Sequence, residues 1–204
     1  MNFILASSNA HKLEELKNYF APLDQFNLEL ASEKIAVEET GSTYYENAHL
    51  KAEKYYQKFK KPTLADDSGL NVTALPDDLG IHSSRFGGGN LTDLEKNELL
   101  LSKLSEDREA SFTCVLCFYL NPQEIFFFEG GLKGIIATEI KGDKGFGYDP
   151  VFIPEGRAQE MQNKGHDELI TLAMIPDWKA ANSHRAKACA SAVQFFRERD
   201  GQSL

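Results

Sequence analysis

The sequence predicts an α/β protein in which helices flank a central mixed β-sheet and the chain forms two lobes. Short strand-like runs alternate with helix-like segments in the first half of the 204 residues, whereas the second half is richer in consecutive strands. The composition, 42% hydrophobic and 26% charged, is that of a compact globular protein. We therefore expect one domain over residues 1–204, arranged in two lobes.

The first elements form a strand, a loop and a helix. Residues 3–6 are apolar and of strand length, and apolar side chains follow at helical spacing from Leu13 to Phe20. Asn9 is placed to cap that helix at its start. A second strand is expected near residues 28–30.

A second helix is predicted by Thr43 and Glu46, which have the spacing of a capping box. It runs to about Phe59 and ends at Lys60-Lys61-Pro62, since proline cannot continue a helix. The next strand is short, residues 63–65, and leads into a loop at residues 66–69.

The remaining elements are a helix, three strands and a last helix. Thr92 and Glu95 form another capping-box pattern, which opens a helix ending near Leu104. Strands are expected at residues 111–120, 124–129 and 132–140, and the last helix at residues 183–199.

The charge excludes some partners. The 22 basic and 31 acidic residues give a net charge of −9, which argues against binding to a nucleic acid polymer or to an anionic membrane. No apolar run reaches the roughly 20 residues of a membrane-spanning helix. Three cysteines and the absence of a signal-like start favour a cytoplasmic protein.

Two predicted helix starts carry cations where the helix dipole disfavours them. Lys12 lies in the first turn after Asn9, and His184 and Arg185 directly follow Ser183. A cation in such a position costs about 0.3–1 kcal/mol unless an anion is bound nearby. Residues 7–12 are therefore a candidate phosphate site. The alternative is an ordinary cap with a solvent-exposed lysine.

Adjacent carboxylates mark a third place. Asp66 and Asp67 follow a buried-type strand, where their mutual repulsion would be relieved by a divalent cation such as Mg²⁺. Glu39 supplies a further carboxylate for the same ion if the loops meet. The alternative is an Asx turn in which Gly69 has positive φ.

Two other motifs do not predict a cofactor or metal site. The glycines at 142, 145 and 147 do not form a dinucleotide-binding loop, because we expect an extended segment, not a helix, after Asp149. Cys114 and Cys117 lie on opposite sides of a strand and suit core packing. Phe146, between glycines and near Asp149, is suited to holding a flat heterocycle.

Five motifs in order resemble the inosine/xanthosine triphosphate pyrophosphatase family. They are Ser-x-Asn-x-x-Lys at 7–12, Glu-Glu-Thr-Gly-x-Thr-x-x-Glu-Asn-Ala-x-x-Lys-Ala at 38–52, Ala-Asp-Asp-Ser-Gly-Leu at 65–70, Gly-Phe-Gly-Tyr-Asp-Pro-Val-Phe at 145–152 and Ser-His-Arg at 183–185. The resemblance implies a two-lobed fold with the active site in the cleft between the lobes. It also implies a homodimer that uses Mg²⁺ to hydrolyse ITP, dITP and XTP to the monophosphate and pyrophosphate.

The resemblance also assigns roles to residues of this chain. Asp67 is expected to be the catalytic base, and Asp67 and Glu39 to hold Mg²⁺. The residues expected to bind the substrate are Ser7, Ser8, Asn9, Ala10, His11, Lys12, Ser68, Phe146, Gly147, Tyr148, Asp149, Lys179, His184 and Arg185.

Two departures from the family pattern leave alternatives open. Leu79-Gly80 replaces the usual Pro-Gly near Arg85, so the role of Arg85 is not assigned. The chain is longer than the pattern between Pro154 and Ser183, so Lys164 competes with Lys179 for the same role. A pyrophosphatase for pyrimidine or modified nucleotides, and a catalytically silent nucleotide-binding module, are the alternative functions.

Overall fold

The chain forms two compact units that each collect several segments of the sequence. This computed structural model describes residues 1–7, 9–24, 26–156, 170–199 and 201. The first unit comprises residues 1–68, 114–130 and 185–204, and the second unit comprises residues 69–113 and 131–184. Three strands, β3, β4 and β5, contribute residues to both units.

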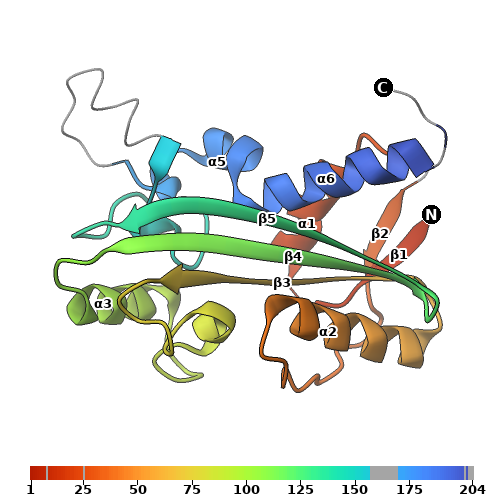
Figure 1. Cartoon of the computed structure of the whole chain (residues 1–204), viewed down its shortest axis with the longest axis horizontal. Helices are drawn as coiled ribbons and strands as arrows, with labels where there is room; N and C mark the ends of the chain where they lie inside the picture. Colours follow the sequence, from red (N-terminus) through yellow and green to blue (C-terminus); the bar gives the residue numbers. More distant parts are fainter. Residues whose placement is uncertain (8, 25, 157–169, 200, 202–204) are drawn as a thin grey trace. The chain divides into compact units, whose positions relative to one another are not determined.

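The strands form a six-stranded sheet in the order β2-β1-β3-β4-β5-β6 (Figure 1). The strands are β1 (Asn2–Leu5), β2 (Asn27–Leu30), β3 (Thr63–Val72), β4 (Glu109–Asn121), β5 (Glu124–Ile136) and β6 (Phe152–Pro154). The parallel pairs β1–β2 and β1–β3 and the antiparallel pair β5–β6 make the sheet mixed. The predicted fold class, a mixed sheet flanked by helices, is confirmed, whereas the position of the active site in a cleft stays a prediction.

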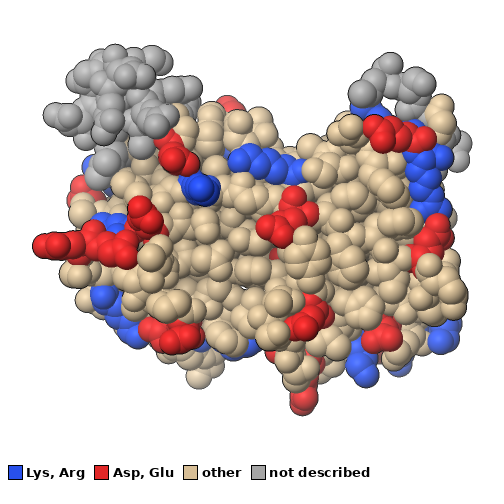
Figure 2. Space-filling view, viewed as in Figure 1, with Lys and Arg blue, Asp and Glu red and all other residues tan. Residues whose placement is uncertain are grey.

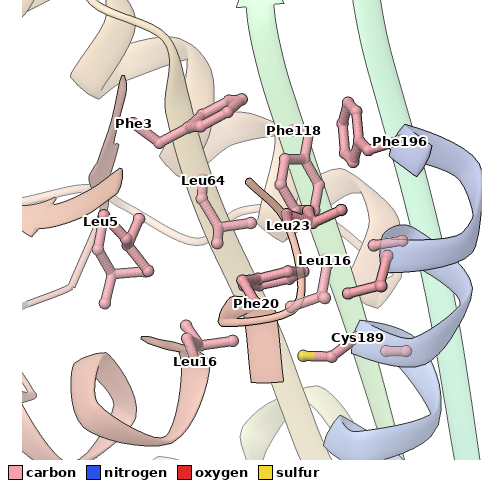
Figure 3. Packing of buried hydrophobic residues seen from close by; sticks show 14 of the residues in the cluster. Phe3, Leu5, Leu16, Phe20, Leu23, Leu64, Leu116, Phe118, Cys189 and Phe196 are labelled. Atoms are coloured by element: carbon pink, nitrogen blue, oxygen red, sulfur yellow. The ribbon is translucent and has the colours of Figure 1, made fainter. Parts of the chain in front are cut away.

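In the first unit, helices cover both faces of the strands. The helices α1 (Ala10–Phe20) and α6 (His184–Arg199) supply Leu16, Phe20 and Phe196 to a cluster with Phe3 and Phe118 (Figure 3). The helix α2 (Tyr44–Phe59) packs against the opposite face through residues 48, 52 and 55. Alternate residues of β4 point into the two clusters, as the strand period of two requires.

The predicted helix caps are present. Thr43 accepts a hydrogen bond from the backbone N–H of Glu46 at the start of α2, which ends at Lys60 with φ of 53°. Thr92 and Glu95 form the complete capping box at the start of the helix α3 (Asp93–Lys103). Asn9 accepts from the backbone N–H of Lys12 at 3.3 Å and so caps α1.

The second unit has one large hydrophobic cluster. It joins strand residues such as Leu70, Phe112 and Leu132 to Leu100 of α3. Short helical segments complete this unit: η1 (Gly80–Arg85), η2 (Asp149–Val151), η3 (Leu172–Met174) and α5 (Pro176–Asn182).

Three predicted boundaries are wrong. The strand expected at residues 63–65 continues through the two aspartates to Val72, so no Asx turn forms, and Gly69 is not among the glycines with positive φ. The two strands expected at 124–129 and 132–140 are one strand, β5, because Gly130 and Gly131 are accommodated within it. Residues 149–151 form a single 3₁₀ turn before β6 instead of an extended segment.

Charged side chains lie on the surface, and the three cysteines lie in the interior. In the face shown in Figure 2, acidic and basic side chains are interspersed. Cys114, Cys117 and Cys189 are buried free thiols, and burial raises the pKa of Cys114 to about 12. Within the described ranges, no helix combines the length and the apolar character that a bilayer span requires.

Candidate active site

The aspartates of β3 lie side by side in sequence but on opposite faces of the strand. Successive side chains of a strand point to opposite faces. Asp66 shares its face with Leu64, which packs against α1 and α6, and Asp67 shares its face with Ala65, which packs against α2. Each carboxylate meets cations from the helix layer on its own side, and the divalent cation expected at this place stays a prediction.

Asp66 is the common partner of both cations at the two helix starts. Lys12 Nζ lies 3.0 and 2.8 Å from its two carboxylate oxygens, and Arg185 Nη2 lies 3.3 Å from Oδ2. Arg185 also donates to Glu15 at 3.0 Å and to Ser68 Oγ at 3.3 Å. Burial opposes ionisation of Asp66, but the charges of Lys12 and Arg185 outweigh it and hold its pKa well below the ordinary value. The negative charge that the two helix starts favour is thus present within the chain.

Asp67 is joined to Glu39 by a lysine that the site prediction omitted. Lys51 Nζ lies 2.6 Å from Asp67 Oδ1 and 2.9 Å from Glu39 Oε1. Burial raises the pKa of Asp67, and Lys51 offsets only part of this effect. Lys51 lies within the motif at 38–52, so the motif contained the signal, but its spacing alone did not show which carboxylates the lysine would reach.

One oxygen of Asp67 has capacity for another ligand. Oδ2 is buried and has no hydrogen-bond partner among the residues that the structure describes. In the same residues no group of three or more His, Cys, Asp and Glu side chains is arranged as a metal site. Mg²⁺ usually takes only one or two protein carboxylates, with water and phosphate oxygens completing its shell. Asp67 and Glu39 fit that limited donor set.

The described residues of the predicted phosphate segment lie just before α1 and in its first turn. Ser7 Oγ accepts from the backbone N–H of Asn9 at 3.1 Å, and Asn9 and Ala10 are exposed. Ser8 and the side chain of His11 lie outside the described part of the chain. The predicted residues of the first unit thus form two groups, with Lys12, Ser68 and Arg185 around Asp66 and with Glu39 joined to Asp67 through Lys51.

The second unit gathers a different set of predicted residues. Asp149 Oδ2 accepts from Lys179 Nζ at 2.6 Å and from the backbone N–H of Phe146 at 2.9 Å. The Lys179 ammonium also lies 4.5 Å from the centre of the Phe146 ring, a cation–π distance. Gly145 has φ of 79°, and a Cβ there would overlap the Asp149 carboxylate. The aromatic face and the carboxylate of this loop are thus held next to the ammonium of Lys179, which lies on α5.

Two other predicted residues, Tyr148 and His184, have contacts inside the second unit. The Tyr148 hydroxyl donates to the Ser83 carbonyl at 2.8 Å in the interior, and burial raises the pKa of Tyr148. The His184 ring stacks on Phe112, with ring centres 4.7 Å apart. Both side chains therefore support the interior of this unit.

The sequence left the roles of Arg85 and Lys164 open, and only Arg85 lies among the described residues. Arg85 is exposed and lies 2.7 Å from a ring nitrogen of His82. Lys164 lies outside the described residues, so its competition with Lys179 is not tested.

A separate hollow of about 640 Å³ lies on the second unit. Its described lining includes Asn71, Glu109, Lys133 and Glu155, and none of the predicted site residues. This hollow is therefore distinct from both groups of predicted residues.

Comparisons with known proteins agree with the motifs. A family model described as the Ham1 family matches residues 3–195. The dITP/XTP pyrophosphatase of Aquifex aeolicus (strain VF5) is 39% identical over 210 aligned residues, which cover 97% of this chain and 97% of that protein. The dITP/XTP pyrophosphatase of Deinococcus radiodurans is 40% identical over 192 residues, with 93% and 90% covered.

Solved structures extend the match to the fold. The Ham1 protein of Staphylococcus aureus has a TM-score of 0.83 and 35% identity, with 98% of this chain and 100% of that chain covered. A HAM1 protein from Coxiella burnetii has a TM-score of 0.84 and 34% identity, with 97% and 99% covered. Since sequence and fold match over nearly the whole length, the chain belongs to the Ham1 family.

Proposed function

We propose that this protein hydrolyses ITP, dITP and XTP to the nucleoside monophosphate and pyrophosphate. The observation that carries the proposal is the charge cluster on β3, in which a buried Asp67 oxygen without a described partner lies in the same unit as Lys12 and Arg185. The full-length relatives named dITP/XTP pyrophosphatase support the same substrates.

Lys12 and Arg185 bind the triphosphate. Both lie in the first turn of a helix, where backbone N–H groups and the dipole favour an anion. In the absence of nucleotide their charge is balanced by Asp66. The phosphate oxygens take over part of that role, and Ser68, which already contacts Arg185, donates a further hydrogen bond.

Glu39 and Asp67 would hold Mg²⁺ beside the bound triphosphate. Their carboxylates are brought to one place by Lys51, and Asp67 Oδ2 has no described partner. When bound, the ion neutralises charge that develops on the phosphate oxygens. Lys51 shares the two carboxylates with it and limits their repulsion.

Asp67 accepts the proton of the attacking water. In the metal-free protein burial raises the pKa of Asp67, so this carboxylate takes up a proton more readily than an exposed aspartate. Lys51 donates to Oδ1 at 2.6 Å and so fixes the orientation of this carboxylate. The water oxygen forms a bond to the α-phosphorus, the bond from that phosphorus to the bridging oxygen breaks, and pyrophosphate leaves.

The loop of the second unit selects the base. Phe146 stacks on the purine, Asp149 accepts the N1–H of a 6-oxopurine, and Lys179 donates to O6. We assign the O6 contact to Lys179, because Lys179 is bonded to Asp149, whereas Arg185 is bonded to Asp66, Glu15 and Ser68. Adenine reverses both hydrogen-bonding groups and leaves buried polar atoms unpaired, which disfavours ATP.

A cytoplasmic location and a homodimer belong to the same proposal. Three buried free thiols suit a reducing compartment, and the dimer follows from the family resemblance. Sedimentation of the purified protein at micromolar concentration tests the dimer, and a monomer mass would contradict it.

The experiment is a Mg²⁺-dependent assay of pyrophosphate release from ITP, dITP, XTP, GTP, ATP, TTP and UTP. We expect ITP, dITP and XTP to be preferred, and a preference for TTP or UTP would overturn the proposal. Asp67→Asn should lower turnover by about 10²-fold or more while ITP still binds, as measured by calorimetry. The exposed Asp77→Asn is the matched control, and normal turnover in Asp67→Asn would refute the assigned base.

A further inference from the structure

Helix α3 holds the loop that carries the proposed base-binding residues. Asp93 and Asn97 are one helical turn apart, so their side chains lie on the same face of α3. Asp93 Oδ2 accepts from the backbone N–H of Gly147 at 2.8 Å, and Asn97 Nδ2 donates to the Gly147 carbonyl at 2.9 Å. Both backbone polar groups of one residue are therefore bonded to one helix.

Gly147 is held by these two backbone hydrogen bonds. Its φ is 61°, and a Cβ at this position would have nothing within 4 Å. The residue lies between Phe146 and Tyr148, and Phe146 donates its backbone N–H to Asp149 Oδ2 at 2.9 Å. The orientation of the Phe146 ring and of the Asp149 carboxylate thus depends on where α3 fixes Gly147.

Asn97 is a polar residue at a buried position of α3, where neither solubility nor helix propensity favours asparagine. Its side chain is buried, and among the described residues its Oδ1 has no hydrogen-bond partner. Asparagine also has lower helix propensity than leucine. A buried amide with one unsatisfied oxygen costs free energy, so the Nδ2 bond to Gly147 is the evident gain from having asparagine there.

We propose that Asp93 and Asn97 are positioning residues that hold the Phe146–Asp149 loop and thereby set the selectivity for 6-oxopurine bases. The proposal rests on the proposed function for its substrate. The two hydrogen bonds from α3 to Gly147, called the clamp below, do not depend on that function. It assigns no chemistry to either side chain. Its consequence is that loss of either bond affects base recognition more than phosphate binding.

The kinetic test uses Asn97→Leu and Asp93→Ala. Each is expected to lower kcat/KM for ITP by about tenfold, chiefly through KM, and to lower the ratio of kcat/KM for ITP over ATP. The inhibition constant of inorganic pyrophosphate should be unchanged. Asp93→Asn keeps an acceptor oxygen and should retain wild-type selectivity, as should Glu98→Gln at an exposed position of the same helix.

The structural test does not depend on turnover. Hydrogen exchange followed by mass spectrometry should show faster exchange of the peptide containing residues 145–149 in Asn97→Leu and Asp93→Ala, but not in Asp93→Asn or Glu98→Gln. Unchanged exchange in folded Asn97→Leu and Asp93→Ala overturns the clamp. Faster exchange with an unchanged ITP/ATP ratio overturns the selectivity role. Failure of the wild-type protein to hydrolyse ITP refutes the proposed function, and with it that role, but leaves the exchange result to decide the clamp.

Discussion

Replacing Asp66 with asparagine is expected to lower the free energy of unfolding by about 3 kcal/mol at pH 7. The carboxylate is 1% exposed and accepts hydrogen bonds from Lys12 and Arg185. The substitution would leave both cations facing a neutral amide. Removing one partner of a buried ion pair costs about 3–5 kcal/mol. We use the lower end, because Arg185 keeps Glu15 and the Lys12 side chain is 21% exposed.

Urea unfolding measures this loss directly. A domain has a total stability of about 5–15 kcal/mol, so the expected change is a large fraction of it. It corresponds to a fall in melting temperature of roughly 6–12 °C for a chain of this size. The control is Asp78→Asn, since Asp78 forms an exposed pair with Lys103 at 2.7 Å. Such exposed pairs contribute at most about 1 kcal/mol.

The pH dependence gives a second readout with a defined sign. The pKa of Asp66 is lower in the folded protein than in the unfolded chain, where it is about 3.9. Its stabilisation is therefore fully present above the unfolded pKa and is lost as the pH falls through the folded pKa. The gap between wild type and Asp66→Asn should be wide at pH 7 and narrower at pH 3. A variant within about 0.5 kcal/mol of wild type at pH 7, or a gap that widens with acid, refutes this reasoning.

Two further substitutions test the loop around Gly145 in the second unit and Lys51 in the first unit. Gly145→Ala should lower the melting temperature and ITP turnover, because φ is 79° and the new Cβ overlaps the Asp149 carboxylate. Gly147→Ala is the control, since its backbone also has positive φ but its Cβ would meet nothing within 4 Å. An equal loss in both variants would show that overlap with Asp149 is not the cause. Lys51→Met should lower the melting temperature in metal-free buffer, because Asp67 loses its cation, and Mg²⁺ should then raise it more than in wild type. A wild-type response of Lys51→Met to Mg²⁺ would show that the ion and the ammonium do not share these carboxylates.

Local signals in the sequence predicted α1, α2, α3 and α6, but not the short helix α5. Thr43 and Thr92 each cap a helix through a residue three positions later, so the necessary information lies in one short window. Asn9 caps α1 for the same reason. The strand boundaries depended on distant residues and were predicted less well.

The continuation of β3 through Asp66 shows why. A carboxylate in a buried strand position is costly unless it is paired, so the sequence favoured a turn. The pairing comes from Lys12 and Arg185, which are 54 and 119 residues away. No local pattern shows that both will reach the same oxygen. The omission of Lys51 has the same origin, since its two partners lie before and after α2 in the chain.

The same long-range pairing gives the proposed site its order before a nucleotide binds. Lys12 and Arg185 are disfavoured at helix starts by about 0.3–1 kcal/mol each, and Asp66 offsets this while fixing both side chains. Binding then requires the triphosphate to compete with one carboxylate instead of ordering two flexible cations. A triphosphate carries several negative charges and Asp66 carries one, so the exchange favours the substrate. In the proposed mechanism, Asp66 of the acidic strand β3 is therefore what keeps the phosphate-binding cations in place.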